Sequence, residues 1–225
     1  MKDTIRKIFR GVGVYYPLYY LRQSPTIIRW MGGGCPVPAP HAIKMRVVRS
    51  YLRTYKLKQF VETGTYLGDT LEYIAREGVD CMSIELSEQL YAAATRRFAG
   101  FENVNLILGD SAQEMPKLLT RLGTPALFWL DGHYSGGFTA RGETDSPIIA
   151  ELEAIYNHPI AGHVILIDDA RCFNGINDYP RLDDLLRKIK MEGRYNSEVS
   201  MDIIRLVPRS VAWVISVCAC TVLWP

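Results

Sequence analysis

The stretch QFVETGTYLGDTLEYIAREGVDCMSIE, residues 59–85, decides the fold of this chain. Two short apolar runs at its ends each close with a glutamate, Glu62 and Glu85, and a segment long enough for a helix separates them. A short buried strand, a helix and a second short strand form the repeating unit of a parallel sheet. The stretch therefore predicts an α/β unit.

Three further apolar runs extend the pattern, and each ends in aspartate: Val104 to Asp110, Ala126 to Asp131 and Val164 to Asp169. We expect strands near 58–62, 80–85, 103–109, 125–131 and 162–168. Helical spacing between the runs predicts helices near 68–77, 87–98, 112–122, 145–156 and 179–191. Two short segments near 196–200 and 202–207 favour an antiparallel hairpin at the sheet edge.

The fold class that follows is α/β, with a Rossmann-like, doubly wound and mostly parallel sheet. A C-terminal antiparallel hairpin and a helical N-terminal appendage complete it. We divide the chain into an appendage with a cover helix (1–57), a central α/β domain (58–210) and an apolar tail (211–225). The cover helix is expected over 41–56, with Ile43 and Val47 on its apolar face and Lys44 largely elsewhere.

The composition is that of an ordinary globular protein, with 225 residues, 48% hydrophobic and 22% charged. A formal net charge of +2 gives no reason to expect a nucleic-acid partner, because such a face needs clustered lysine and arginine. The five cysteines are odd in number and lack paired CxxC spacing. This favours free thiols in a reducing cytoplasm over a disulfide framework.

The acidic residues that close the five runs are expected along one edge of the sheet. Open parallel sheets bind ligands outside the carboxyl ends of their strands. Carboxylates gathered there without partners would repel one another, so we expect a polyhydroxylated, cationic or metallic ligand. This edge is the active-site hypothesis.

The segment after the first run, Glu62-Thr63-Gly64-Thr65-Tyr66-Leu67-Gly68-Asp69-Thr70, opens a helix. Gly64 permits a tight turn because glycine takes positive φ without steric cost, and Gly68 would let a ligand approach the backbone. The spacing is not the GxGxxG of dinucleotide binders, which disfavours a dehydrogenase. Glu62 would repel a phosphate but suit an amino group or a sulfonium.

Two further segments match the positions that hold a nucleoside in such folds. Glu85 lies about 20 residues beyond the glycine turn, where an acid binds ribose hydroxyls in nucleotide-binding α/β folds. Gly109-Asp110-Ser111 can offer polar groups to an adenine edge. Ser111 can also cap a helix that starts at Ala112, and the two roles are compatible.

From Phe60 to Phe173 the sequence resembles the class I S-adenosylmethionine-dependent methyltransferases. Within that class it is most similar to the metal-dependent O-methyltransferases, namely catechol O-methyltransferase, the caffeoyl-CoA enzymes and the macrolide and aminocoumarin sugar O-methyltransferases. The resemblance is carried by Glu62 to Gly68 for the glycine motif, Ser83-Ile84-Glu85-Leu86 for the ribose-binding strand and Gly109-Asp110-Ser111 for the adenine-side turn.

The resemblance implies that residues 58–210 bind S-adenosylmethionine and that the helix over 41–57 covers it. The cofactor-binding residues that it implies are Glu62, Gly64, Tyr66, Gly68, Thr70, Glu85, Asp110 and Ser111. The first 57 residues and the tail lie outside the resemblance.

The resemblance also implies a metal site formed by Asp131 and the pair Asp168-Asp169. Carboxylates are hard oxygen ligands of the kind that Mg²⁺ prefers. Successive strand residues point to opposite faces, so Asp168 and Asp169 converge only if the strand ends before them. Without the resemblance, this pair is equally well explained as a solvated strand end.

His133 stands two residues after Asp131, where the sugar O-methyltransferases place an acidic base. Histidine titrates near neutrality and can take the acceptor proton, so His133 and Asp131 are the predicted catalytic residues. The family base is lysine or aspartate, and two other roles for His133 stay open: lining the acceptor pocket, or a structural role. The loop Gly132 to Thr144 is expected to close over the acceptor.

The expected function is divalent-metal-dependent O-methylation of a small hydroxylated acceptor, such as a sugar or a secondary metabolite. Two alternatives stay open. One is a metal-independent methyltransferase whose aspartates orient the acceptor by hydrogen bonds. The other is an α/β module that binds a nucleoside without turnover.

Two partner hypotheses come from the flanks of the chain. The N-terminal aromatics, Tyr15 to Tyr20, and the apolar tail suggest weak contact with a membrane surface, although the tail is shorter than the ~20 residues of a membrane span. Alternatively, the aromatic segment forms the interface of a homo-oligomer.

Overall fold

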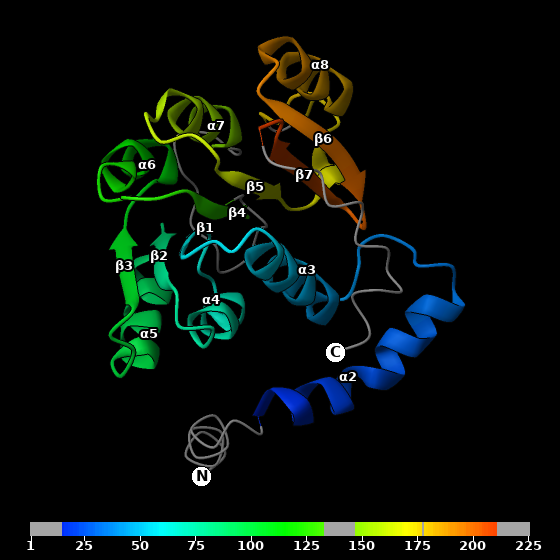
Figure 1. Ribbon diagram of the computed structural model, residues 1–225. Coiled ribbons are helices and arrows are strands. Elements are labelled where there is room, and N and C mark those ends of the chain that lie inside the picture. The colour runs from blue at the N-terminus through cyan, green and yellow to red at the C-terminus, as the bar shows by residue number, and fades with distance from the viewer. Residues whose placement is uncertain (1–14, 133–146, 177, 211–225) are drawn as a thin grey trace.

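The computed structural model describes residues 15–132, 147–176 and 178–210 (Figure 1). Within these residues, seven strands form one sheet in the order β3-β2-β1-β4-β5-β7-β6. The strands are β1 (Gln59–Thr63), β2 (Asp80–Glu85), β3 (Val104–Leu108), β4 (Ala126–Leu130), β5 (Val164–Ile167), β6 (Tyr195–Ser200) and β7 (Ile203–Pro208). The first five pair in parallel, and β7 pairs antiparallel with β5 and β6. The predicted fold class is confirmed, including the C-terminal hairpin.

Helices cover both faces of the sheet (Figure 1). Side chains from α3, α4 and α5 pack on one face, and side chains from α6, α7 and α8 pack on the other. The described helices are α2 (Tyr15–Gly32), α3 (His41–Thr54), α4 (Asp69–Ala75), α5 (Glu88–Phe98), α6 (Ser111–Leu119), α7 (Ile148–Asn157) and α8 (Leu182–Glu192), with a 3-10 turn, η1, at Ala170–Cys172.

Strand β4 shows why these strands need continuous apolar runs. Leu127 and Trp129 belong to the cluster with α3, α4 and α5, whereas Phe128 and Leu130 belong to the cluster on the opposite face. Side chains alternate between the faces of a sheet, and every residue of β4 is buried. A strand that is covered on both faces cannot place polar residues at alternate positions.

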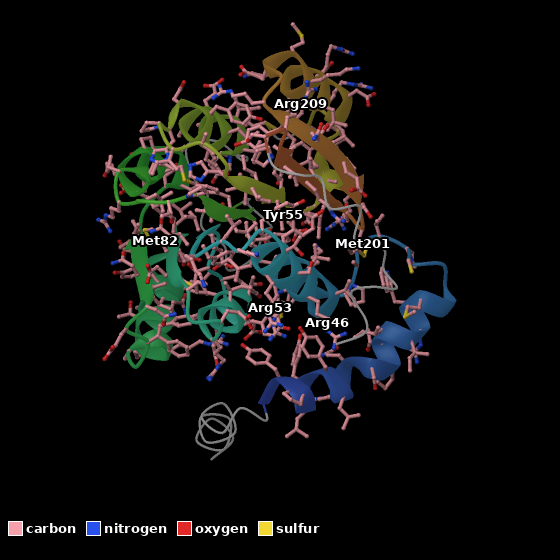
Figure 2. All side chains as sticks on the ribbon, viewed as in Figure 1. Arg46, Arg53, Tyr55, Met82, Met201 and Arg209 are labelled. Atoms are coloured by element: carbon pink, nitrogen blue, oxygen red, sulfur yellow. The ribbon has the colours of Figure 1, made fainter. Side chains whose placement is uncertain are left out.

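A two-residue turn, Met201-Asp202, joins β6 to β7. Both residues have positive φ, 54° and 67°, as in the turns whose twist matches that of hairpin strands. The carbonyl of Asp202 accepts a hydrogen bond from the Ala170 N–H at 2.8 Å, and Met201 packs at the junction of α2 and α3 (Figure 2). The turn therefore lies between the segment after β5 and the first two described helices.

Helix α2 differs from the sequence analysis, which predicts a helical appendage but places no helix over residues 15–32. Pro25 argues against one, because proline within a helix leaves a carbonyl without its N–H donor. At Pro25 that carbonyl belongs to Leu21, and the Ser24 hydroxyl donates to it at 2.7 Å. Packing on α3 and α4 then outweighs the weak local propensity.

None of the described helices is both long enough and apolar enough to cross a membrane.

Candidate functional site

The acidic residues that close the strands lie along the carboxyl edge of the sheet, in the order of the strands. The backbone ladder continues one step past the ends of β4 and β5, because Asp131 N–H donates to the Thr63 carbonyl (3.1 Å) and Asp168 N–H to the Leu130 carbonyl (3.0 Å). Strands β2 and β3 extend the sheet to one side of β1, and β4 and β5 extend it to the other. Open α/β sheets bind ligands where the strand order reverses in this way.

Gly64 turns the chain directly beside the end of β4. Its φ is 80°, and a Cβ at this position would lie 2.5 Å from the carbonyl oxygen of Asp131 and 3.2 Å from Cα of Gly132. Both neighbours are backbone atoms, so a side-chain rotation cannot relieve the contact. Only glycine allows β1 to end in this turn.

The rest of the glycine turn leads into α4. Gly68 has a φ of 77° at the N-cap position, and a Cβ there would lie 2.7 Å from the ring of Phe98. Packing against Phe98 is sufficient reason for glycine at position 68. The Thr70 hydroxyl lies 3.1 Å from Nε2 of His41, and Tyr66 is exposed.

Glu62 is a buried carboxyl at the end of β1, with 2% of its surface exposed. Its Oε2 accepts a hydrogen bond from Ser83 Oγ (2.9 Å), which lies 2.7 Å from Thr65 Oγ1. Burial raises the pKa of Glu62 to about 8; the Ser83 hydrogen bond opposes this shift, and the nearby charge of Glu85 adds to it. A cationic ligand group placed beside Glu62 would favour its ionised form.

Glu85 closes β2 and ties the glycine turn to this strand. Its Oε2 accepts from the Tyr66 N–H (2.8 Å) and its Oε1 from the Ser87 N–H (2.9 Å). Each carboxylate oxygen has a further lone pair. Glu85 can therefore accept hydrogen bonds from two vicinal hydroxyls while it keeps both backbone contacts.

Asp110, at the end of β3, caps helix α6. Its Oδ1 accepts from the Ala112 N–H at 2.9 Å, and the helix begins at Ser111. The prediction that Ser111 caps a helix starting at Ala112 is wrong by one residue, because Asp110 has the extended backbone of an N-cap (φ −73°, ψ 125°). Ser111 is buried instead, and a Cβ on Gly132 would lie 3.4 Å from its Oγ.

The structure brings Asp131, Asp168 and Asp169 together. Strand β5 ends at Ile167, and Asp169 adopts the left-handed conformation, with φ 54° and ψ 50°. Since the strand ends before the pair, alternation does not separate the two side chains. One oxygen from each of the three carboxylates lies within 4.8 Å of the others. We call these three residues the aspartate cluster.

A lysine from α3 reaches the aspartate cluster. Lys44 Nζ donates to Asp168 Oδ2 and to Asp169 Oδ1, both at 2.8 Å, and Lys44 is only 8% exposed. The expectation that Lys44 lies off the buried face is therefore wrong. It stands one helical turn before Val48 and two before Tyr51, which are both buried, and this spacing was the signal in the sequence.

A second cation comes from the 3-10 turn after β5. The Arg171 guanidinium donates to Asp169 Oδ1 at 2.6 Å and also pairs with the Asp202 carboxylate. The Arg171 backbone N–H donates to Asp202 Oδ1 at 2.9 Å. No local pattern in the sequence singles out Arg171 and Asp202, because their contact depends on where the hairpin turn docks.

The chemistry of the aspartate cluster suits a hard divalent cation, since the donors are carboxylate oxygens. Burial raises the pKa of Asp168, and the Lys44 ammonium opposes that shift. Burial alone would lower the pKa of Lys44, but Asp168 and Asp169 outweigh it and raise the pKa. Lys44 is therefore an ammonium, and a metal bound by all three carboxylates would have to share or displace it.

A small cleft opens beside Asp168 on the side of α7. Ile148, Phe173 and Tyr179 contribute to its walls. His133 and the loop to Thr144, which the sequence analysis assigns to the acceptor, lie outside the described residues apart from Gly132.

Known structures share this fold at low sequence identity. An O-methyltransferase from Bacillus cereus, solved in complex with SAH, aligns with a TM-score of 0.56 and 14% identity over 81% of this chain and 89% of its own. The O-methyltransferase TomG from Streptomyces achromogenes, involved in tomaymycin synthesis and solved with SAM, aligns with a TM-score of 0.55 and 18% identity over 90% and 97%.

A third structure, the SAH-bound methyltransferase PaMTH1 from Podospora anserina, aligns with a TM-score of 0.54 and 18% identity over 74% of this chain and 78% of its own. No family model matches the sequence, and no curated protein matches it. The chain thus has the Rossmann-like fold of these O-methyltransferases, although the sequence identity is only 14–18%.

Proposed function

We propose that this chain is an S-adenosylmethionine-dependent methyltransferase that methylates an oxygen of a small hydroxylated acceptor. The observation that carries the proposal is the arrangement along the sheet edge: Glu85, Glu62 and the aspartate cluster follow one another at the ends of β2, β1, β4 and β5 around the turn at Gly64. Structures solved with SAM or SAH on the same fold support it.

Each residue at this edge is proposed to bind a different part of the cofactor. Glu62 is suited to the amino group, because a buried carboxyl gains most from a neighbouring cation. Glu85 is suited to the ribose hydroxyls, and Asp110 and Ser111 to the adenine side. Gly64 keeps the turn in close contact with the backbone that follows β4.

The aspartate cluster is proposed to serve the acceptor. When bound, the cofactor supplies an activated methyl group. A divalent cation such as Mg²⁺ would lower the pKa of a hydroxyl that it chelates. Asp131, Asp168 and Asp169 would hold the cation, and His133 is our proposed proton acceptor. Alignment of the acceptor by these residues can contribute ~7–11 kcal/mol. A sugar or a secondary metabolite fits this chemistry.

The position of Lys44 favours a second candidate, a methyltransferase that works without metal. Its ammonium already bridges Asp168 and Asp169, so the carboxylates have a cationic partner from the chain itself. In this version Asp131 and the bridged pair orient the acceptor hydroxyl by hydrogen bonds. Both candidates are proposed to work in a reducing cytoplasm. This proposal is supported by the free thiols of three described cysteines, Cys35, Cys81 and Cys172.

The first experiment is calorimetric titration of the protein with S-adenosylmethionine and S-adenosylhomocysteine. We expect micromolar binding that weakens about 10- to 100-fold in Glu85→Ala, since hydrogen bonds to a charged group contribute ~1.5–3 kcal/mol. Asp183→Ala, an exposed acid in the first turn of α8, is the matched control. Absence of binding to both nucleosides would overturn the methyltransferase proposal.

Methyl transfer to simple diols, measured with Mg²⁺ and with a chelator, then separates the two candidates. Loss of transfer in the chelator supports the metal-dependent version. Full transfer in the chelator, together with loss of transfer in Lys44→Met, supports the metal-independent version.

A further inference from the structure

One face of α2 is fixed to the rest of the protein by aromatic contacts. The ring centroid of Tyr16 lies 4.6 Å from that of Tyr73 on α4. The guanidinium of Arg46 on α3, which Figure 2 labels, lies 4.1 Å from the Tyr20 ring. Ile27 and Trp30 are buried on the same face. The helix is therefore held in one orientation, with its opposite face outward.

The outward face of α2 carries a row of apolar side chains. Leu18, Leu21, Pro25 and Ile28 follow one another at intervals of three, four and three residues, which places them on one side of a helix. Leu21 is 69% exposed and Ile28 is 67% exposed. We call this row the outer stripe of α2. Nothing in the described part of the chain covers it.

The charges around the outer stripe have one sign. Arg22 and Arg29 stand beside it, both are exposed, and neither forms an ion pair with a described residue. α2 contains no acidic residue over its 18 positions. The asymmetry extends to the whole N-terminal segment: residues 1–40 contain six Lys or Arg and one Asp, a net charge of +5, whereas the full chain has a net charge of +2 and residues 41–225 therefore −3.

A helix with apolar side chains along one side, arginines beside them and no acids has the chemistry of an interfacial helix. Such helices lie in the plane of a bilayer with the apolar row in the headgroup and acyl boundary, and anionic lipids attract their basic residues. A second copy of the chain offers weaker complementarity, since pairing two outer stripes would bring arginines of like charge together.

We infer that the outer stripe of α2 docks on the surface of an anionic lipid bilayer. Leu18, Leu21 and Ile28 enter the interface, and Arg22 and Arg29 contact the headgroups. The attachment is peripheral and reversible, and it is independent of the proposed methyl transfer because none of these residues belongs to the functional site.

Co-flotation of the full-length protein with lipid vesicles tests the inference. We expect binding to vesicles of phosphatidylcholine with about one third phosphatidylglycerol, and little binding to phosphatidylcholine alone. Raising the salt to about 1 M, where the Debye length is only about 3 Å, should release most of the protein. Equal binding to both vesicles, or to neither, would overturn the inference.

Substitutions then locate the surface. Leu21→Glu with Ile28→Glu should weaken binding about 100-fold or more, because both side chains lose apolar burial. Arg22→Gln and Arg29→Gln should each weaken it about fivefold on anionic vesicles only. Met191→Glu on α8 makes the same kind of change at a residue that is 81% exposed, and it should leave binding unchanged. Circular dichroism checks that each variant is folded.

Two results would contradict the inference even if the protein binds to anionic vesicles. One is that Leu21→Glu with Ile28→Glu binds as wild type does, which would place the lipid contact elsewhere. The other is a concentration-dependent dimer in sedimentation velocity that the same double substitution abolishes, with no difference between the two kinds of vesicle. The outer stripe would then be an interface between copies.

Discussion

The ammonium nitrogen of Lys44 lies 2.8 Å from Oδ2 of Asp168, although 124 residues separate the two in the chain. The contact joins α3, which precedes the first strand, to the carboxyl end of β5. It places a fixed positive charge where the predicted metal would be coordinated. Lys44 and a divalent cation are therefore competitors for Asp168 and Asp169.

Replacing Lys44 with methionine should raise the affinity for Mg²⁺ by about tenfold or more, because a competing buried charge is removed. In chelator, the same variant should unfold at a lower temperature than wild type, and Mg²⁺ should restore most of the difference. Calorimetry and thermal unfolding measure the two effects. Arg53→Met, on the exposed side of α3, is the control. Weaker Mg²⁺ binding in Lys44→Met would show that the lysine supports the metal site.

The close approach of Gly64 to β4 predicts a large cost for alanine at this position. Gly78 has a similar φ, 73°, but a Cβ there meets nothing within 4 Å. Gly78→Ala should therefore cost about 1–2 kcal/mol from the left-handed backbone alone. Gly64→Ala should cost clearly more, because a Cβ would also clash with the Asp131 carbonyl. Urea unfolding compares the free energies of unfolding of the two variants. Equal losses would show that the backbone at Asp131 moves away from the added Cβ at little cost.

The raised pKa of Glu62 makes stability depend on pH. Glu62 ionises near 4.5 in the unfolded chain and at about 8 when buried, so its contribution is fully present below pH 4.5 and is lost as the pH rises toward 8. The change in the free energy of unfolding across this pH range is on the order of a few kcal/mol. Glu62→Gln should flatten this dependence in urea unfolding between pH 5 and 8.

Glu62 should also couple cofactor binding to proton release. If the amino group of S-adenosylmethionine lies beside Glu62, binding at pH 7 should release close to one proton, because the cation lowers the raised pKa. Calorimetry in buffers of different ionisation enthalpy measures this number. Glu62→Gln should abolish the release, and an unchanged release in that variant would assign the proton to another group.

Asp202 is expected to support the aspartate cluster from the hairpin turn. Asp202→Asn keeps a residue that tolerates positive φ but weakens the contact with Arg171, so the Arg171–Asp169 contact should loosen. We expect a loss of about 1–3 kcal/mol in stability and a change in Mg²⁺ affinity. Asp178→Asn, an exposed position that also has positive φ, should change neither by a comparable amount.

The sheet could be predicted because its strands are buried on both faces. Apolar runs such as 126–130 and 164–167 have no alternating polar residues, and an acid marks the end of each. The turn at Met201-Asp202 was also within one residue of the prediction. These signals are local, so a single sequence displays them.

The contacts made by Lys44 and the helix over 15–32 could not be predicted in the same way. Lys44 has the spacing of a buried position, but lysine is rarely buried without a partner, and its partners lie more than 120 residues downstream. α2 depends on Tyr16 and Tyr20 packing against Tyr73 and on Ser24 compensating for Pro25. The partners of Lys44 and the packing of α2 are therefore properties of the folded structure, although the spacing of Lys44 is visible in the sequence.

The position of α3 has a consequence for the order in which the molecule assembles. This helix is synthesised before any strand, yet its buried face packs in one cluster with Trp129, Leu166 and Val207. At about 5–20 residues per second, the ribosome needs roughly 10–30 s to deliver the last of these partners. During that interval the apolar face of α3 and the charge of Lys44 have no native surroundings. The buried face of α3 therefore gains its complete native surroundings only after β7 has been synthesised.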